Sequence, residues 1–396
     1  MTTDSVTAAP ATPDDLVARA HDLMPLLRAH AERSERECTL APEVVTSLRD
    51  AGFFRLTSPA KFGGCDLDLA GQTKVIAAVS RGCASAGWVV AAETAATSLA
   101  RWLPEPAQAE IFDGQPDVMM LSTSSTTTKA PIEATAVDGG FRLSGRFGFA
   151  TGCEISDWAL LAEVPVKGDG PDRSMISCVV PVSELSVDRT WQVAGMCGTG
   201  THSIVLDGTL VPEHRAVQFS ASGAPIDEDQ LPAVFIRASM GTLAALVGAA
   251  QGALDTVREM LAKNPSVTFT KYESAIDSPA VRQWFAEASH LVDSSVLHMT
   301  HVAAKLDGIP LVQPVPWVER AAFRMHMSSS LRDARNAVDK LLDIGGARGF
   351  AMSNPLQRYW RDLAVGSRHA SFHAPTILDD YSLALWAKRP SFIAVA

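Results

Sequence analysis

Histidine and cysteine side chains are the first candidates for chemistry in this sequence, because both types commonly bind metals. His298 and His301 stand three positions apart within a helical pattern, so their side chains could share one helix face. No matching pair of carboxylates accompanies them, and we therefore expect no metal site there. The six cysteines include no C-x-x-C pair, which argues against structural zinc and a disulfide framework. Scattered, mostly buried free thiols are expected instead.

A glycine-rich run, Gly-Met-Cys-Gly-Thr-Gly-Thr at residues 195–201, is the next candidate. Such a run binds a dinucleotide phosphate when a helix follows it, but residues 203–206 have the pattern of a strand. The sequence also lacks the G-x-S-x-G, Walker A and H-E-x-x-H motifs. We therefore expect this chain not to bind a nicotinamide cofactor itself.

Charge and hydropathy restrict the classes of partner. The 396 residues carry a formal net charge of −10, and the pI is about 5.5. Nucleic acids and anionic membranes are thus unexpected partners, because phosphate contacts need clustered Lys and Arg. No apolar run reaches the roughly 18–20 residues of a membrane span, and the first fifteen residues do not resemble a signal peptide. These observations predict a cytoplasmic protein without a membrane partner.

The elements that must position any site change type twice along the chain. The first hundred residues favour helices: Thr12 is a predicted N-cap with Pro13 in the first turn, and further helical stretches are expected at 42–51, 68–82, 84–101 and 105–112. Beyond about residue 117 the segments become short and β-like, at 132–137, 141–143, 158–164, 175–182 and 203–211. Asp138-Gly139-Gly140 predicts a hairpin turn between the first two.

The C-terminal part is helical again. After a polar linker at 220–232, four long helical stretches are expected at 233–262, 278–307, 317–344 and 354–387, and together they predict a four-helix bundle. We therefore predict three domains: a helical domain at 1–116, a mostly antiparallel β domain at 117–220, and a helical bundle at 221–396.

This order of elements resembles the acyl-CoA dehydrogenases, and residues 59–64 (PAKFGG) are similar to the turn after that family's second helix. Other segments resemble one branch of the family, at 82–88, 143–152, 195–205, 345–350 and 361–370. That branch is the oxygenase component of two-component, reduced-flavin-dependent monooxygenases. The resemblance implies an α+β fold, with an N-terminal helical domain, a central antiparallel β domain and a C-terminal four-helix bundle.

The two branches differ in one catalytic group. Many acyl-CoA dehydrogenases carry a glutamate about nine residues after an Arg-Asp pair, and it removes a proton next to a thioester. Nine residues after Arg361 stands Ala370, and no Asp or Glu occurs between Asp362 and Asp379. The adjacent His369 could instead donate hydrogen bonds to a flavin or to a substrate hydroxyl. This difference favours the oxygenase branch.

The resemblance also implies the residues of the site. His369 and Thr151 are the expected catalytic residues. Lys271 is a candidate substitute for an arginine that contacts the flavin phosphate in relatives, and the glycines at 345 and 346 are expected to approach the flavin of a neighbouring subunit. The complete set of expected flavin contacts is Trp88, Leu121, Ser122, Thr123, Ala150, Thr151, Gly152, Lys271, Gly345, Gly346 and His369.

The implied function is hydroxylation of an aromatic or indole-like small molecule through a C4a-hydroperoxyflavin. Reduced FAD or reduced FMN would be the cofactor and O₂ the co-substrate, with the flavin supplied by a separate NAD(P)H:flavin reductase. Family members stack their bundles, so a homotetramer is expected. Two alternatives stay open: an amino-sugar N-oxygenase on the same fold, and an acyl-CoA dehydrogenase with a relocated base.

Overall fold

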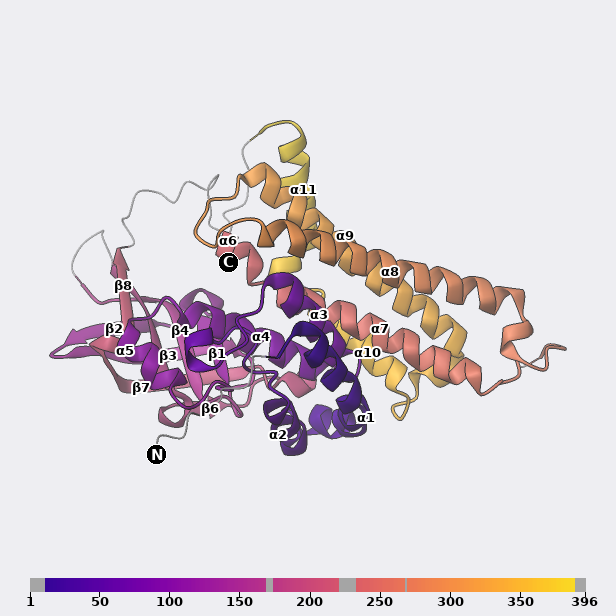
Figure 1. Cartoon of the computed structure of the whole chain (residues 1–396), viewed down its shortest axis with the longest axis horizontal. Helices are drawn as coiled ribbons and strands as arrows, with labels where there is room; N and C mark the ends of the chain where they lie inside the picture. The colour runs from indigo at the N-terminus through magenta and orange to yellow at the C-terminus, as the bar shows by residue number, and fades with distance from the viewer. Residues whose placement is uncertain (1–10, 169–173, 221–232, 268, 389–396) are drawn as a thin grey trace, which may run out of the picture.

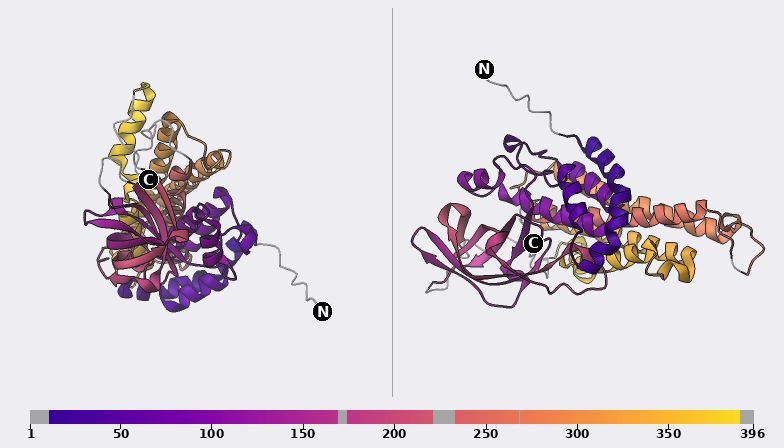
Figure 2. Two further views of the ribbon diagram at one scale, coloured as in Figure 1. Left: turned by 90° about the vertical axis from the view of Figure 1, so that its left-hand side faces the viewer. Right: turned by 90° about the horizontal axis from the view of Figure 1, so that it is seen from below.

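The strands lie at one end of the molecule and the long helices extend to the other, with the N-terminal helices between them (Figure 1). The same arrangement is seen from below (Figure 2). This computed structural model describes residues 11–168, 174–220, 233–267 and 269–388, so most of the predicted linker at 220–232 lies outside the described residues. The predicted α+β class and the order of helices, sheets and helices are confirmed.

The N-terminal helices begin as their capping residues predict. The Thr12 side chain accepts a hydrogen bond from the Asp15 backbone N–H, and Pro13 occupies the first turn. Because these local signals satisfy the free N–H groups of the first turn, the first helix begins at Pro13. The helices of this part are α1 Pro13–Glu37, α2 Pro42–Asp50, α3 Leu69–Ser80, α4 Ala84–Ala100 and α5 Glu105–Phe112.

Two four-stranded sheets make up the β part. One has the order β1-β4-β5-β8, namely Met120–Ser124, Trp158–Pro165, Ser174–Pro181 and Ala216–Ser220. The other has the order β2-β3-β7-β6, namely Ile132–Val137, Gly140–Ala150, His202–Pro212 and Ser186–Asp188. All strand pairs are antiparallel except β1 with β4, so the prediction of mostly antiparallel strands is confirmed. Gly139 adopts a φ of +76° in the predicted hairpin turn.

The C-terminal helices are α6 Ala233–Arg237, α7 Met240–Ala262, α8 Pro279–Asp307, α9 Trp317–Gly345, α10 Pro355–Gly366 and α11 Ala374–Leu385. The single helices predicted at 233–262 and 354–387 were therefore wrong. The first is split into α6 and α7 by a turn at residues 238–239, and the free N–H groups at the α6 start, those of Ala233 and Val234, donate to carbonyls of the α8–α9 connection. The second is broken before Pro375, whose ring is incompatible with a continuing helix. The break places residues 367–369 in a turn, which is followed by one short 3-10 turn at Ala370–Phe372.

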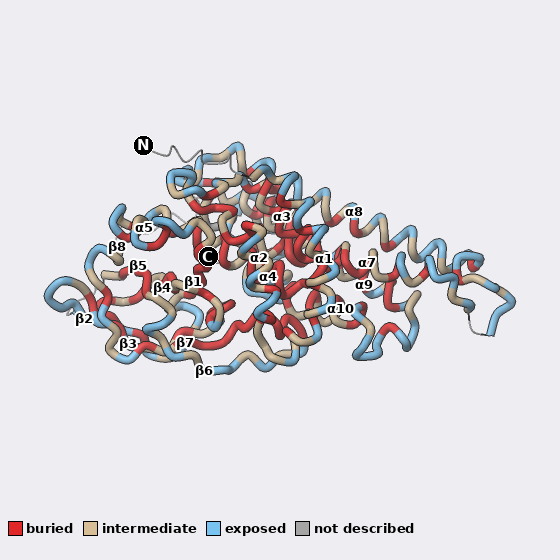
Figure 3. The backbone as a smooth tube through the Cα atoms, turned by 60° about the horizontal axis from the view of Figure 1, so that its bottom comes forward, coloured by how far each residue is buried: buried red, intermediate tan, exposed pale blue. Residues whose placement is uncertain are grey.

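Buried backbone is concentrated where α3, α4 and α7 meet (Figure 3). The helices approach so closely that a Cβ at Gly248 would lie 2.2 Å from the carbonyl oxygen of Ala77. A Cβ at Gly87 would lie 1.7 Å from the Ser80 hydroxyl oxygen. These glycines therefore allow α4 and α7, which carry parts of the site described below, to pack directly against α3.

Replacing Gly248 with alanine is expected to destabilise the fold. The gain in helix propensity is about 1 kcal/mol, and it offsets only part of the overpacking against a backbone carbonyl, so we expect a net loss of at least ~1 kcal/mol. The matched control is Gly308→Ala, where the nearest atom, the Lys305 carbonyl oxygen, would be 3.5 Å from the new Cβ. Denaturant unfolding of both variants measures the difference. Equal stabilities would contradict the close α3–α7 packing.

Candidate active site

His369 lies in the turn that follows α10. Its imidazole packs edge-on against the Trp88 indole of α4, with ring centroids 5.8 Å apart. The Ser371 backbone N–H donates to its Nδ1 atom at 3.3 Å. In the neutral ring the other nitrogen must then carry the hydrogen, so Nε2–H is available as a donor.

The surroundings of His369 disfavour the charged form of its ring. Protein packed around the imidazole lowers the pKa of His369 below its ordinary value, while the residue as a whole is exposed in the single chain. The His369 ring thus packs on Trp88 along one edge and remains accessible from solvent. A neutral imidazole with a free Nε2–H can donate one hydrogen bond to a ligand.

Thr151 follows the last residue of β3 and begins a directed chain of hydrogen bonds. The Thr199 hydroxyl donates to the Met196 carbonyl at 2.8 Å, and it lies 2.7 Å from the Thr201 hydroxyl. Thr201 in turn lies 3.0 Å from the Thr151 hydroxyl. Each hydroxyl has a single hydrogen, so the direction is fixed: Thr151 donates to Thr201, which donates to Thr199. We call these three threonines the hydroxyl chain; it leaves Thr151 only lone pairs for a ligand.

The neighbouring residues of the β3 end form a strained turn. Phe149 has a φ of +56° and Gly152 a φ of +73°, a conformation that favours glycine. The Gly152 backbone N–H donates to the Thr199 carbonyl at 3.0 Å, while Ala150 is fully buried. The Phe149 side chain is 60% exposed and meets Trp191 edge-on. An exposed aromatic beside a polar turn is suited to contact with a flat ligand.

Strand β1 contributes three expected contacts of different character. Leu121 points into the core between the sheets, and Thr123 donates its hydroxyl hydrogen to the Gly148 carbonyl at 2.8 Å. Thr123 thus fastens β1 to the end of β3. Ser122 points the other way and is half-buried, and its hydroxyl makes no hydrogen bond within the described part of the chain. Among the three, Ser122 has the side chain free to bind a ligand.

Three parts of the chain meet at this site. A Cβ at Gly366 of α10 would lie 3.3 Å from Trp88, 2.9 Å from Met196 and 2.6 Å from Leu246 of α7. The buried Asp362 of α10 accepts a hydrogen bond from the Met196 backbone N–H. The same α10 turn therefore positions both His369 and the Met196 carbonyl at the end of the hydroxyl chain. Trp88 and His369 are in contact here, and the hydroxyl chain links Thr151 to the loop of Met196 that packs beside Trp88.

Lys271, Gly345 and Gly346 do not join them within one chain. A Cβ at Gly345 would contact Leu356, which lies ten residues, or about 15 Å along a helix, from Gly366. Lys271 is exposed in the connection after α7. The α7 helix ends at Ala262, about 24 Å along its axis from Leu246. Any role of these residues in the site requires another subunit.

The sequence prediction missed several residues of the site. Thr199 and Thr201 were inside the glycine-rich run, but nothing local indicated a hydroxyl chain that ends at Thr151. Asp362 was noted only as part of the Arg-Asp pair; burial raises its pKa to about 7. Glu93 did carry a signal: a lone carboxyl group in the small, apolar helix α4 is unusual.

Glu93 lies directly behind the turn of Gly152. It is fully buried, and the Ser156 hydroxyl donates to its Oε1 atom at 2.7 Å. Its Oε2 atom has no hydrogen-bond partner within the part of the chain that the structure describes. Burial raises the pKa of Glu93 to about 8. Glu93 is therefore protonated at neutral pH, and its side chain supports the turn as a neutral group.

Replacing Glu93 with glutamine should make the fold less sensitive to alkaline pH. An unfolded glutamate loses its proton near pH ~4.3, whereas folded Glu93 keeps it to about 8. The folded chain binds the extra proton in this window, so its free energy of unfolding falls as the pH rises. Relative to the parent, Glu93→Gln should gain about 3–4 kcal/mol between pH 5 and pH 8. Thermal unfolding across that range checks this, with the exposed Glu105→Gln as control; a pH-independent difference contradicts it.

Two further histidines, His202 and His298, have partners within the structure. His202, at the end of the glycine-rich run, is fully engaged: its Nδ1 accepts from the Trp191 N–H and its Nε2 contacts the Cys38 carbonyl, both at 3.1 Å. Its role is structural. His298 of α8 pairs with His326 of α9, their Nδ1 atoms 2.9 Å apart.

Known proteins resemble this chain along nearly its full length. The acyl-CoA dehydrogenase N-terminal domain model matches residues 21–111, and the C-terminal domain model matches residues 240–374. The flavin-dependent monooxygenase oxygenase subunit HsaA of Rhodococcus jostii (strain RHA1) is 30% identical over 368 residues, covering 89% of this chain and 93% of that protein. The chain belongs to the flavin-dependent monooxygenases with the acyl-CoA dehydrogenase fold.

Two further relatives agree with this assignment to the flavin-dependent monooxygenases. The FADH2-dependent resorcinol hydroxylase oxygenase component of Rhizobium sp. (strain MTP-10005) is 31% identical, and the match covers 90% of each chain. The structure of XiaF from Streptomyces sp. in complex with FADH2 and glycerol superimposes with a TM-score of 0.85 at 26% identity, covering 97% of this chain and 98% of that one. In the described ranges of this monooxygenase, no helix is long and apolar enough to cross a membrane.

Proposed function

We propose that this chain oxygenates a small aromatic or indole-like molecule with O₂ and reduced FAD or reduced FMN. The observation that carries the proposal is the junction of α4, the β3 end and α10, where the His369 ring packs on Trp88 and the hydroxyl chain runs from Thr151 to the Met196 carbonyl. Relatives named for aromatic substrates support it: the resorcinol hydroxylase and an indole-3-acetate monooxygenase of Pseudomonas putida, which is 26% identical.

The residues of the junction suit a reduced flavin. The ring system of a flavin needs apolar surfaces for its faces and polar partners at its edge. Trp88 and Phe149 offer aromatic surface, and the Ser122 hydroxyl is free. Thr151 can only accept, so it suits the N–H groups of a reduced flavin. The bound flavin would supply the electrons that activate O₂.

This chain would contribute orientation, a dry site and hydrogen bonds. The Trp88 indole and the carbon atoms of Met196 and Leu246 surround Gly366 and would keep water away from that side of a bound ligand. The Nε2–H of His369 can donate to an oxygen atom of the substrate or of the reacting oxygen. Glu93 and Asp362 are buried and hydrogen-bonded on the far side of the turn and loop that they support. Neither is placed to remove a proton from a thioester substrate, which disfavours the dehydrogenase alternative.

The test is reconstitution with a separately purified NADH:flavin reductase. With the reductase, reduced flavin and O₂, a panel of phenols and indoles should give hydroxylated product. Alone, this chain should not oxidise NADH at enzymatic rates of ~1–10³ per second. NADH oxidation by the chain alone, or bleaching of its bound oxidised flavin by an acyl-CoA, would contradict the proposal. An amino sugar oxidised at nitrogen in place of every phenol and indole would favour the N-oxygenase alternative.

The need for NAD(P)H places the system in the cytoplasm in this proposal.

We also propose that the chain works as a homotetramer with sites shared between subunits. Lys271, Gly345 and Gly346 would then complete the flavin site of a neighbour. Exposed apolar side chains on and after α11 support an assembly: Leu378, Leu385 and Trp386 are 52%, 66% and 79% exposed in the single chain. Light scattering during gel filtration measures the mass, and an active monomer would contradict shared sites.

Replacing Thr151 with valine should weaken binding of reduced flavin about 10-fold, because a buried hydrogen bond of about 1–2 kcal/mol is lost. The substitution also leaves the Thr201 hydroxyl without its donor. Thr151→Ser, which keeps the hydroxyl, is the matched control and should bind nearly as the parent does. Anaerobic titration with reduced flavin gives the dissociation constants. Parent-like binding by Thr151→Val would remove this hydroxyl from the flavin site.

A further inference from the structure

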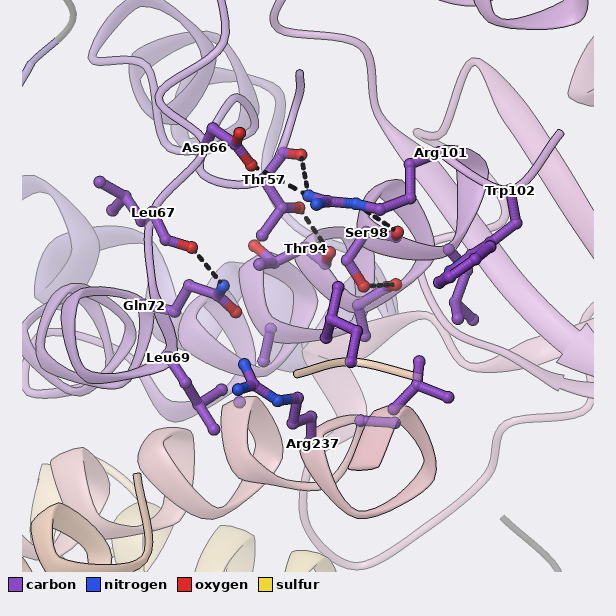
Figure 4. Close-up of a pocket in the computed structure, with 17 residues that line it drawn as sticks. Thr57, Asp66, Leu67, Leu69, Gln72, Thr94, Ser98, Arg101, Trp102 and Arg237 are labelled. Carbon is purple, nitrogen blue, oxygen red and sulfur yellow. Dashed lines mark hydrogen bonds and ion pairs between the residues drawn. The ribbon is translucent and has the colours of Figure 1, made fainter. Parts of the chain in front are cut away.

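A cavity lies between α3, α4 and the α6–α7 segment, and its α4 wall belongs to the same helix as Trp88. Its volume is about 110 Å³, enough for a short chain or a small polar group but not for a substrate ring together with its flavin. The side chains around it are shown in Figure 4, where Arg101 and Arg237 stand on opposite sides of the cavity. Its apolar lining comes from Leu67, Leu69, Ala91, Ala95, Leu99, Val234 and Leu311. A polar centre within apolar walls is typical of a ligand subsite.

Two polar atoms of this cavity have no partner among the described residues. The Thr94 side chain is 3% exposed, and its Oγ1 atom makes no hydrogen bond. The Nε–H of Arg237 is buried and also unpaired, although the other nitrogens of that guanidinium bind Asp307 and the carbonyls of Leu306 and Ile309. Buried polar atoms without partners cost free energy. Both atoms can donate a hydrogen bond, so the missing group is an acceptor.

The charges of the lining point to an anionic acceptor. Arg101 and Arg237 face a single lining carboxylate, Asp66, which pairs with Arg101 at 3.0 Å. Burial lowers the pKa of Arg237 and the nearby Arg101 lowers it further, while Asp307 opposes them. A carboxylate in the cavity would relieve the repulsion between the two guanidinium groups and satisfy Thr94 and Arg237 together.

Two helices connect this cavity to the junction. Ala91, Ala95 and Ser98 line the cavity from one face of α4, and Trp88, three residues before Ala91, lies on that same face. On α7, Gly241 lines the cavity, while Leu246 packs near Trp88 around Gly366. Thr94 is six residues from Trp88, about 9 Å along the helix. A ligand with its ring beside Trp88 would need an extended chain of about that length to reach Thr94.

We propose that this cavity binds the carboxylate tail of the aromatic substrate, held by Arg101, Arg237 and Thr94, while the ring lies beside Trp88 and His369. The inference rests on the proposed function, since it assigns the ring to the oxygenation site. It names the substrate class: an aromatic ring that carries a flexible chain ending in a carboxylate. We call the cavity the tail subsite.

The test compares phenols that differ only in the end of the chain. The probes are 4-hydroxyphenyl-alkanoic acids of increasing chain length and 4-alkylphenols of matched length, titrated calorimetrically into the full chain without flavin. The acid of best-fitting length should bind about 10- to 100-fold tighter than its alkyl partner, as expected for hydrogen bonds to a charged group. No acid preference at any chain length would overturn the tail subsite.

Variants separate a ligand role from a structural one. Thr94→Val removes an unpaired buried hydroxyl, so it should raise the melting temperature of the free chain and yet weaken binding of the acid. A purely structural Thr94 predicts no change in binding. Arg101→Gln should abolish most of the acid preference, and Ala95→Phe should fill the cavity and block the acids. The matched control Arg142→Gln alters an exposed arginine of the β domain that donates to the Gly208 carbonyl, and it should keep the preference.

The outcomes distinguish this inference from the proposed function. Hydroxylated phenols without any acid preference would overturn the tail subsite and leave the oxygenase proposal standing. An acid preference that survives in both Arg101→Gln and Ala95→Phe would also overturn it. If the acids bind through Arg101 but no probe is ever oxygenated, the proposed function fails, and the assignment of the cavity to substrate fails with it.

Discussion

A His369→Ala variant is expected to oxidise reduced flavin with little loss of rate while forming about 10²–10³-fold less oxygenated product, a cost of about 3–4 kcal/mol. The Nε2–H of His369 is a donor directed away from the bond that Nδ1 accepts from Ser371. Its removal takes away a hydrogen bond that would stabilise charge developing on oxygen during transfer. Alanine also leaves room for water beside the Trp88 indole. The reducing equivalents should therefore appear as hydrogen peroxide.

The measurement is the amount of product and of hydrogen peroxide formed for each reduced flavin consumed, together with the oligomer size. His369→Gln is the informative companion, since its amide can donate a hydrogen bond from a similar position; it should recover part of the coupling. Unchanged coupling in an intact oligomer would remove His369 from the site. Loss of assembly with normal coupling in the remaining folded protein would instead identify a subunit contact.

Local signals predicted much of the fold. Two of these signals act only on residues next to them in the sequence: Thr12 with Pro13, and Asp138-Gly139-Gly140. The structure has a helix start at the first and a hairpin turn at the second. The apolar patterns also gave the right order of helices and strands. Pro375 indicates that residues 354–387 cannot form one helix, although the helical pattern there predicts a single helix. The break between α10 and α11 creates the turn that carries His369.

Contacts between distant segments could not be predicted in the same way. The bond from the Met196 N–H to Asp362 joins residues 166 positions apart, and the hydroxyl chain joins the end of β3 to the loop before β7. No periodicity or spacing encodes such pairs, because they depend on how whole elements pack. The resemblance supplied His369, Trp88 and Thr151 as site residues; it could not supply the direction of the Thr151 hydroxyl, which limits this residue to accepting.

Trp88→Ala should combine a stability loss of about 3–5 kcal/mol, typical of a buried aromatic truncated to alanine, with uncoupling similar to that of His369→Ala. The indole is 8% exposed and meets the His369 ring edge-on. Its loss would leave a cavity between α4 and α10, beside Gly366. Water could enter that cavity next to the reacting groups, and the histidine would lose the surface that orients it.

Trp88→Phe separates the two effects, because phenylalanine keeps an aromatic edge for His369 and most of the buried volume. It should retain most of the stability and most of the coupling of product to flavin oxidation. A double variant that combines Trp88→Ala with His369→Ala should lose less product than the two single losses combined, because the Trp88 side chain acts by orienting the His369 ring. Edge-on aromatic pairs couple by about 0.5–1.5 kcal/mol. If Trp88 only fills the core, the folded fraction of Trp88→Ala will form as much product for each flavin oxidised as the parent does. The loss of product in the double variant will then equal the product of the two single-variant losses. Only a shared deficit places Trp88 with His369 at the site where oxygen is transferred.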